Sequence, residues 1–195
     1  MRSARRSSSP RPSEQALPPV TEPTFDPGAI LAVLERHDVR FVLIGGIAAI
    51  TRGAHVVTED LDVTPARDDD NLDRLAVALQ ELDARIRIDQ PPSPPVSLPF
   101  DGKLLASSDI WNLMTRFGKL DLVLKPGGFE QGFDDLSGEA TRERVGERLE
   151  ALVATVDQLI ASKEAAGRAK DREAVLELRR MRRPERHPEP PSRER

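Results

Sequence analysis

Apolar side chains recur at helical spacing in four stretches of the chain. In residues 71–82 they fall on one face of a predicted helix: Leu72, Leu75, Ala76, Leu79 and Leu82. A second helix is predicted to begin at Asp26-Pro27, because aspartate is a good N-cap and proline suits the first helical position. Two closing helices are predicted over 156–166 and 170–181, joined at Gly167.

Short apolar or alternating runs between these helices predict strands. They cover 40–44, 56–64, 84–88 as an edge strand, and 149–154, together with a hairpin over 110–116 and 120–124. Gly45-Gly46 ends the first strand and opens a short helix through Ile50. The proline run at 91–95 predicts a stiff surface loop between two halves of one sheet. This order predicts an α/β (α+β) fold, a small twisted mixed sheet with flanking helices and a C-terminal helical pair.

The two ends of the chain have a different composition from its middle. Residues 1–26 are rich in Ser, Pro and Arg, and 182–195 alternate charges with prolines, so both are predicted to be disordered. The folded domain is then expected over 27–181, with 156–181 as its closing helical part. The absence of cysteine excludes a disulfide framework, a thiolate zinc site and a cysteine nucleophile. No apolar run approaches the length of a membrane span, so we expect no membrane partner and a cytoplasmic location.

Three aspartates carry the candidate chemistry. Asp60 and Asp62 are two residues apart on a predicted strand, so both side chains point to the same face. Two carboxylates so close repel each other unless a cation lies between them, and Mg²⁺ prefers such oxygen ligands. Asp121 lies among apolar neighbours in another predicted strand, and pairing the two strands would bring all three carboxylates together. We therefore expect a catalytic metal site at Asp60, Asp62 and Asp121 that holds two Mg²⁺ ions, with Mn²⁺ as the other candidate.

A glycine turn and a basic helix supply candidate nucleotide-binding residues. Gly45-Gly46 follows a strand and opens a helix, and its backbone amides can approach phosphate oxygens because no Cβ blocks them. No Walker pattern occurs, which excludes a P-loop. Lys163, Arg168 and Lys170 are clustered near the turn of the closing helices and can neutralise a triphosphate. Arg52 can also meet phosphate, and Thr58 can orient water on a metal.

Three motifs in this order resemble the polymerase-beta-like nucleotidyltransferase superfamily. They are Gly45-Gly46-Ile47-Ala48, Glu59-Asp60-Leu61-Asp62 and Leu120-Asp121-Leu122-Val123, and the stretch from Leu159 to Asp171 is similar to the closing helices of its bacterial branch with the AbiEii-type toxins. This resemblance covers about residues 28–180. It implies a nucleotidyltransferase-like fold and metal-dependent transfer of NMP from an NTP to a hydroxyl, with release of pyrophosphate. One departure is Gly45-Gly46 where Gly-Ser is more usual, so a serine hydroxyl is missing.

The acceptor stays open at this point. The resemblance suggests RNA or tRNA, or a protein, as the acceptor of a toxin–antitoxin or phage-defence toxin, which would also have an antitoxin protein as a partner. An antibiotic-modifying enzyme with a small-molecule acceptor is the alternative reaction. A catalytically inactive module that binds a nucleotide or a partner is an alternative of another class, which the presence of all three aspartates disfavours.

Overall fold

The computed structural model describes residues 23–89, 92–146, 149–168 and 171–182. Its elements run in the order α1 (Pro27–Arg36), β1 (Phe41–Ile44), α2 (Gly45–Thr51), β2 (Asp60–Pro65), α3 (Asp69–Glu81), β3 (Arg85–Asp89), β4 (Pro92–Val96), α4 (Gly102–Ala106), β5 (Ile110–Thr115), β6 (Gly118–Val123), α5 (Phe133–Ser137), β7 (Thr141–Val145), β8 (Leu149–Val153), α6 (Val156–Ala166) and α7 (Asp171–Arg182). No helix in these ranges is both long and apolar enough to cross a membrane.

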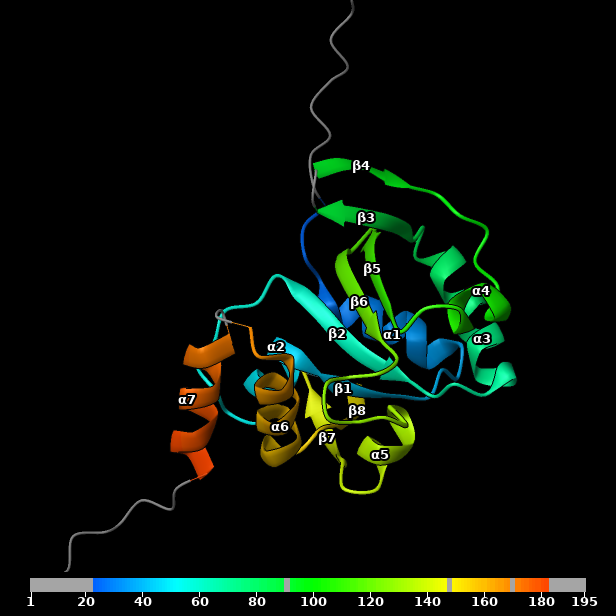
Figure 1. Ribbon diagram of the computed structural model, residues 1–195. Helices are drawn as coiled ribbons and strands as arrows, with labels where there is room; N and C mark the ends of the chain where they lie inside the picture. Colours follow the sequence, from blue (N-terminus) through cyan, green and yellow to red (C-terminus); the bar gives the residue numbers. More distant parts are fainter. Residues whose placement is uncertain (1–22, 90–91, 147–148, 169–170, 183–195) are drawn as a thin grey trace, which may run out of the picture.

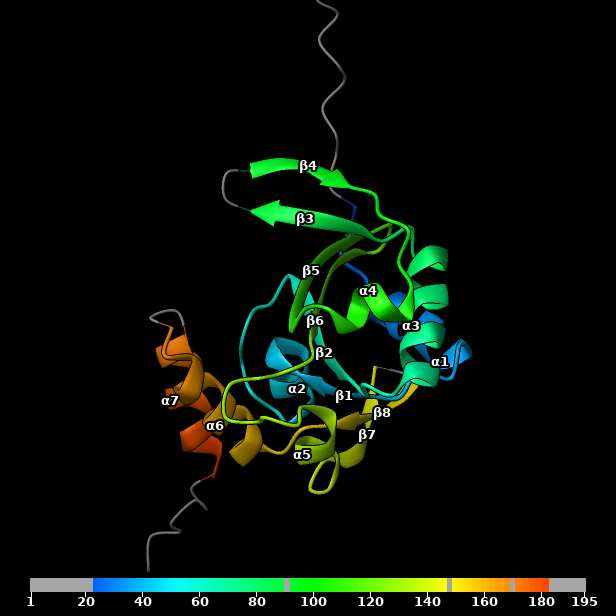
Figure 2. The same ribbon diagram turned by 45° about the vertical axis from the view of Figure 1, so that its right-hand side comes forward.

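All the strands join one mixed sheet of eight strands, in the order β4-β3-β5-β6-β2-β1-β8-β7 (Figure 1). β2 pairs with β6 in parallel and with β1 antiparallel, while β1 and β8 are parallel. Figures 1 and 2 show α1, α3 and α4 on one side of β1 and β2, and α6 and α7 on the other. The fold is therefore mixed α/β, as the sequence predicts.

The core is built from the alternation of the central strands. Leu61 and Val63 of β2, and Leu120 and Leu122 of β6, are almost fully buried. Their neighbours along each strand point to the opposite face, because successive side chains of a strand alternate. The three leucines of α3 join the same core and are fully buried: Leu72, Leu75 and Leu79. The polar residues of β2 and β6 are thereby left on the face that forms the candidate site.

Several predicted elements are confirmed. Asp26 caps α1 by accepting a hydrogen bond from the Ala29 backbone N–H, and Pro27 is the first helical residue. The predicted hairpin is β5 and β6, which pair antiparallel. The closing helices are α6 and α7, and Gly167 ends α6 in the left-handed conformation. Of the predicted N-terminal arm, residues 1–22 lie outside the described ranges. At its end, the Asp26 backbone N–H donates a hydrogen bond to the Phe117 carbonyl at the hairpin turn.

Two strand predictions and one loop prediction are wrong in their details. The strand predicted over 56–64 begins only at Asp60, since β1 ends at Ile44 opposite Asp62, and β6 begins at Gly118, one residue before the partner of Asp60. The proline run predicted as a loop forms β4, which lies at the edge of the sheet, where missing N–H groups are tolerated. Because β4 takes the edge, β3, the strand predicted there, is the second strand from the edge of the sheet. The short elements α4, α5 and β7 were not predicted, because they show no clear apolar periodicity.

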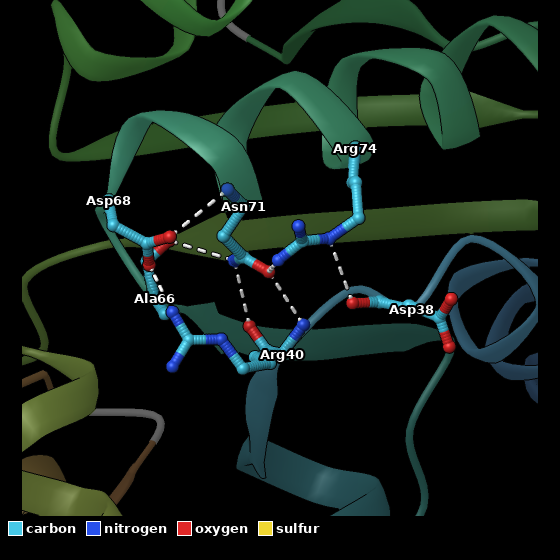
Figure 3. Close-up of polar contacts among 6 residues, drawn as sticks. All are labelled: Asp38, Arg40, Ala66, Asp68, Asn71 and Arg74. Atoms are coloured by element: carbon cyan, nitrogen blue, oxygen red, sulfur yellow. Dashed lines mark hydrogen bonds and ion pairs between the residues drawn. The ribbon is translucent and has the colours of Figure 1, made fainter.

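A buried asparagine joins α3 to the start of β1 (Figure 3). The Asn71 side chain is fully buried and accepts a hydrogen bond from the Arg40 backbone N–H at 2.7 Å. Its amide nitrogen donates to the Arg40 carbonyl at 3.0 Å and to the Ala66 carbonyl at 2.9 Å. Asn71 therefore fixes the chain entering β1 against the chain leaving β2, the two strands that flank the candidate site.

Replacing Asn71 tests this joint. Asn71→Ala removes three hydrogen bonds and leaves the Arg40 N–H and the Ala66 carbonyl without this partner, so we expect the free energy of unfolding to fall by about 2–4 kcal/mol. Urea unfolding at neutral pH measures it, with Asp70→Ala, an exposed neighbour in the same helix, as the matched control. Equal losses in the two variants would contradict a specific role for the Asn71 hydrogen bonds.

Candidate active site

Three carboxylates meet on the sheet face opposite the core. β2 and β6 pair in parallel, with Asp62 directly opposite Asp121. Asp60 precedes Asp62 by two residues on β2, so its side chain lies on the same face. Asp60, Asp62 and Asp121 each offer one carboxylate oxygen, and these three oxygens lie within 4.8 Å of one another. The structure therefore brings together the three aspartates that the sequence predicts to be neighbours.

The pKa of Asp62 is raised in this arrangement. Burial raises the pKa of its carboxyl group to about 7, and the nearby carboxylates of Asp60 and Asp121 contribute to the rise. Lys163 and a hydrogen bond from the Gly46 backbone N–H oppose the shift without reversing it. Burial and the two neighbouring carboxylates therefore disfavour the ionised form of Asp62, as expected of a carboxylate set short of positive charge.

The glycine turn packs directly against these carboxylates. Gly45 has a φ of +68°, and a Cβ at this position would overlap the Asp62 carboxylate. A Cβ at Gly46 would lie 2.5 Å from the Thr58 hydroxyl oxygen. Gly45 is therefore needed for the close approach to Asp62 and Gly46 for the close approach to Thr58, and the Gly46 backbone N–H bonds to the Asp62 carboxylate.

Thr58 orients the outermost carboxylate. Its hydroxyl donates a hydrogen bond to Asp60 Oδ1 at 2.7 Å and also contacts the Asp60 carbonyl at 3.2 Å. The side chain of Asp60 is thus fixed before any ligand binds.

The closing helices bring a lysine to the cluster. Lys163 of α6 lies near enough to Asp62 to lower the pKa of its carboxyl group, and its Nζ is 2.9 Å from Asp171 Oδ1 at the start of α7. Both side chains of this ion pair are largely covered, at 20% and 13% exposed. Arg168 is exposed and lines the same cleft, whereas Lys170 lies outside the described residues.

These groups surround an open cleft of about 870 Å³. Its lining includes the glycine turn, the carboxylate cluster, Lys163 and Arg168. It also includes residues of β3, β5 and β6 that the sequence did not single out: Arg87, Asn112 and Lys119. Such a volume accommodates a nucleotide together with part of a second substrate.

The additional polar residues could be found only once the order of the strands was known. Arg87 alternates with Ile86 and Ile88 along β3, a pattern that marks one polar face without saying what it meets. Lys119 lies opposite Asp60 across the β2–β6 ladder, and its Nζ is 3.4 Å from Glu59 Oε2.

Arg52 does not line the cleft, contrary to the expectation that it meets phosphate. Its guanidinium donates to the carbonyls of Val153 and Ala154 at 2.6 and 2.9 Å, and to Glu143 at 2.6 Å. These contacts tie the end of α2 to β7 and β8. Arg52 therefore has a structural role in the described part of the chain.

No protein-family model matches the chain, and a comparison with curated proteins finds no match. The assignment of chemistry therefore rests on the geometry of the site.

The raised pKa of Asp62 predicts a pH-dependent gain in stability for Asp62→Asn. In the folded protein this carboxyl ionises near pH 7, but in the unfolded chain it ionises near its ordinary value of 3.8. Wild-type stability should therefore decline as pH rises from about 4 to 7, while the uncharged amide of the variant escapes this loss. In EDTA, the advantage of Asp62→Asn should be absent at pH 4 and reach up to roughly 4 kcal/mol above pH 7.

Thermal and urea unfolding between pH 4 and 8.5 measure the difference. Asp69→Asn is the matched control, because Asp69 is exposed at the start of α3. Adding Mg²⁺ at pH 8 should raise the melting temperature of the wild type more than that of Asp62→Asn. A variant that is less stable than the wild type at pH 8 in EDTA would show that the cluster is not under charge repulsion.

Proposed function

We propose that this protein is a metal-dependent nucleotidyltransferase that moves NMP from an NTP to a hydroxyl group and releases pyrophosphate. One observation carries the proposal: three carboxylates from two parallel neighbouring strands converge within 4.8 Å beside a glycine turn, inside a cleft. The order of the motifs along the chain, which resembles the polymerase-beta-like superfamily, is consistent with it.

The donor set fits a hard divalent cation. All its side-chain ligands are carboxylate oxygens, which suit Mg²⁺ or Mn²⁺ and do not favour a thiolate-binding metal. Burial and the carboxylates of Asp60 and Asp121 raise the pKa of Asp62, and a cation bound to the cluster would oppose that rise. Asp60, Asp62 and Asp121 are the residues that would hold the metal. When bound, the ions supply charge that polarises phosphate oxygens and lowers the pKa of an attacking hydroxyl group.

The residues around the cluster divide between the two substrates. Gly45 and Gly46 present backbone amides on one side of the carboxylates, and Lys163 approaches from α6. The triphosphate is assigned to this side, where an ammonium acts as a point charge on phosphate. Asp121 lies on the other flank of the pair, next to the sheet face formed by β5 and β3. The acceptor hydroxyl is assigned to that flank.

In the proposed reaction, the acceptor oxygen forms a bond to the α-phosphorus of the NTP. The bond from that phosphorus to the oxygen that bridges to the β-phosphate breaks, and pyrophosphate leaves with the electron pair. The proton of the hydroxyl passes to Asp121 and from there to solvent. Because Lys163 contacts the triphosphate in the ground state and in the transition state, it contributes to binding as well as to rate.

Site variants separate nucleotide binding from chemistry. Each α-³²P-labelled NTP is incubated with Mg²⁺ and, in separate reactions, total RNA, a mixture of proteins or an aminoglycoside. Asp60→Ala and Asp62→Ala should abolish labelling of the acceptor. Asp121→Asn should bind NTP almost normally and lower single-turnover labelling by about 10²–10⁴-fold. Lys163→Ala should weaken NTP binding and also slow transfer.

Lys103→Ala is the matched control for the lysine, since Lys103 is exposed on α4 and does not line the cleft. Near-normal labelling by both Asp60→Ala and Asp62→Ala would refute the metal assignment. If Asp121→Asn lost NTP binding while Lys163→Ala bound normally, the two sides of the cleft would be assigned the wrong way round.

A further inference from the structure

An arginine on β3 reaches the carboxylate cluster from the side away from the glycine turn. Arg87 Nη2 is 3.0 Å from Asp121 Oδ1 and 3.2 Å from Asp121 Oδ2. Both side chains are mostly covered, at 12% exposed for Arg87 and 14% for Asp121. This ion pair is a defined interaction inside the cleft, because charges this well covered are weakly screened by solvent.

The strand order explains how Arg87 arrives there. β3 pairs with β5 through Ile86 and Leu113, and β5 pairs with β6 through Asn112 and Asp121. Arg87, the residue after Ile86, therefore lies opposite Asn112, which in turn lies opposite Asp121. The three side chains are on the same face of the sheet. Arg87 and Asn112 both line the cleft, so they form its floor beyond the carboxylates.

Arg87 and a divalent cation need the same oxygens. The guanidinium contacts both oxygens of Asp121, and Asp121 is one of the three residues of the proposed metal site. A cation bound to Asp121 would also repel the adjacent positive charge. We therefore expect metal binding to weaken the pair between Arg87 and Asp121, because the cation takes one of these oxygens and repels the guanidinium.

The released guanidinium would lie on the acceptor flank. The carboxylates stand in the middle of the row across the sheet, with the glycine turn after β1 on one side and Arg87 of β3 on the other. Lys163 contacts Asp171 and influences Asp62, so it belongs to the glycine side. A planar guanidinium recognises phosphate well, because it donates two parallel hydrogen bonds.

We propose that Arg87 is the anion-binding residue of the acceptor side, held on Asp121 until a divalent cation replaces it. The proposal rests on the proposed function and adds the class of acceptor, a hydroxyl that lies next to a phosphodiester, as at the end of a polynucleotide. A polycationic acceptor, such as an aminoglycoside, would be repelled by Arg87.

The first test is the affinity of the full-length protein for Mn²⁺ without nucleotide, measured by titration calorimetry. Arg87→Gln removes the competing charge, so it should bind Mn²⁺ roughly tenfold more tightly than the wild type. Arg87→Lys keeps the charge and should bind like the wild type. Arg85→Gln is the matched control, because Arg85 is on the same strand, exposed, and paired with Asp83 outside the cleft.

The second test uses a fluorescent eight-residue RNA as the probe, in EDTA and in Mn²⁺ with a non-hydrolysable NTP. The wild type should bind the RNA at least several-fold more tightly in Mn²⁺. Arg87→Gln should lose that gain, and Arg87→Lys should retain part of it. Melting curves of all variants show whether each one is folded.

The outcomes separate this inference from the proposed function. If the wild type binds no Mn²⁺ that depends on Asp62, the proposed metal site itself fails. If Mn²⁺ binds but Arg87→Gln neither tightens it nor affects RNA binding, Arg87 is a fixed structural contact and the inference is overturned. Improved labelling of an aminoglycoside by the wild type over Arg87→Gln would also overturn it.

Discussion

Three carboxyl groups are held together on one face of the sheet, and much of the candidate site is arranged around the repulsion between their ionised forms. The parallel pairing of β2 with β6 sets Asp62 opposite Asp121, and the alternation of β2 adds Asp60. Backbone ladders on both sides prevent these strands from moving apart. The repulsion can then be relieved only by a proton, a protein cation or a metal. Lys163 lowers the pKa of Asp62 but does not offset burial and the two neighbouring carboxylates.

Each neighbouring element contributes to this balance. The glycine turn lets β1 and α2 approach Asp62 without a steric clash and supplies one amide to its carboxylate. Lys163 and Arg87 approach the cluster from opposite sides, one from α6 and the other from β3. The two cations thereby mark separate regions of the cleft, which is the physical basis for assigning one region to the triphosphate and the other to the acceptor.

The sequence predicted the parts of the site that depend on local pattern. The shared face of Asp60 and Asp62 follows from the two-residue period of a strand, and the pairing of their strand with that of Asp121 follows from the cost of an isolated buried charge. Arg87 could not be found in this way, because its role depends on β3 lying next to β5, a pairing between distant segments. The polar loop before Asp60 and the edge strand β4 were misjudged for the same reason, since both depend on which neighbours are available for pairing.

The central claim is that the carboxylate cluster binds divalent cations together with a nucleoside triphosphate. Crystals grown with Mn²⁺ and an NTP analogue that carries a methylene bridge between the α- and β-phosphates test it most directly. Anomalous diffraction at the manganese edge should show the metal between the carboxylates of Asp60, Asp62 and Asp121, with the triphosphate toward Gly45, Gly46 and Lys163. A nucleotide bound elsewhere, or bound in the cleft with no manganese at the cluster, would contradict the account.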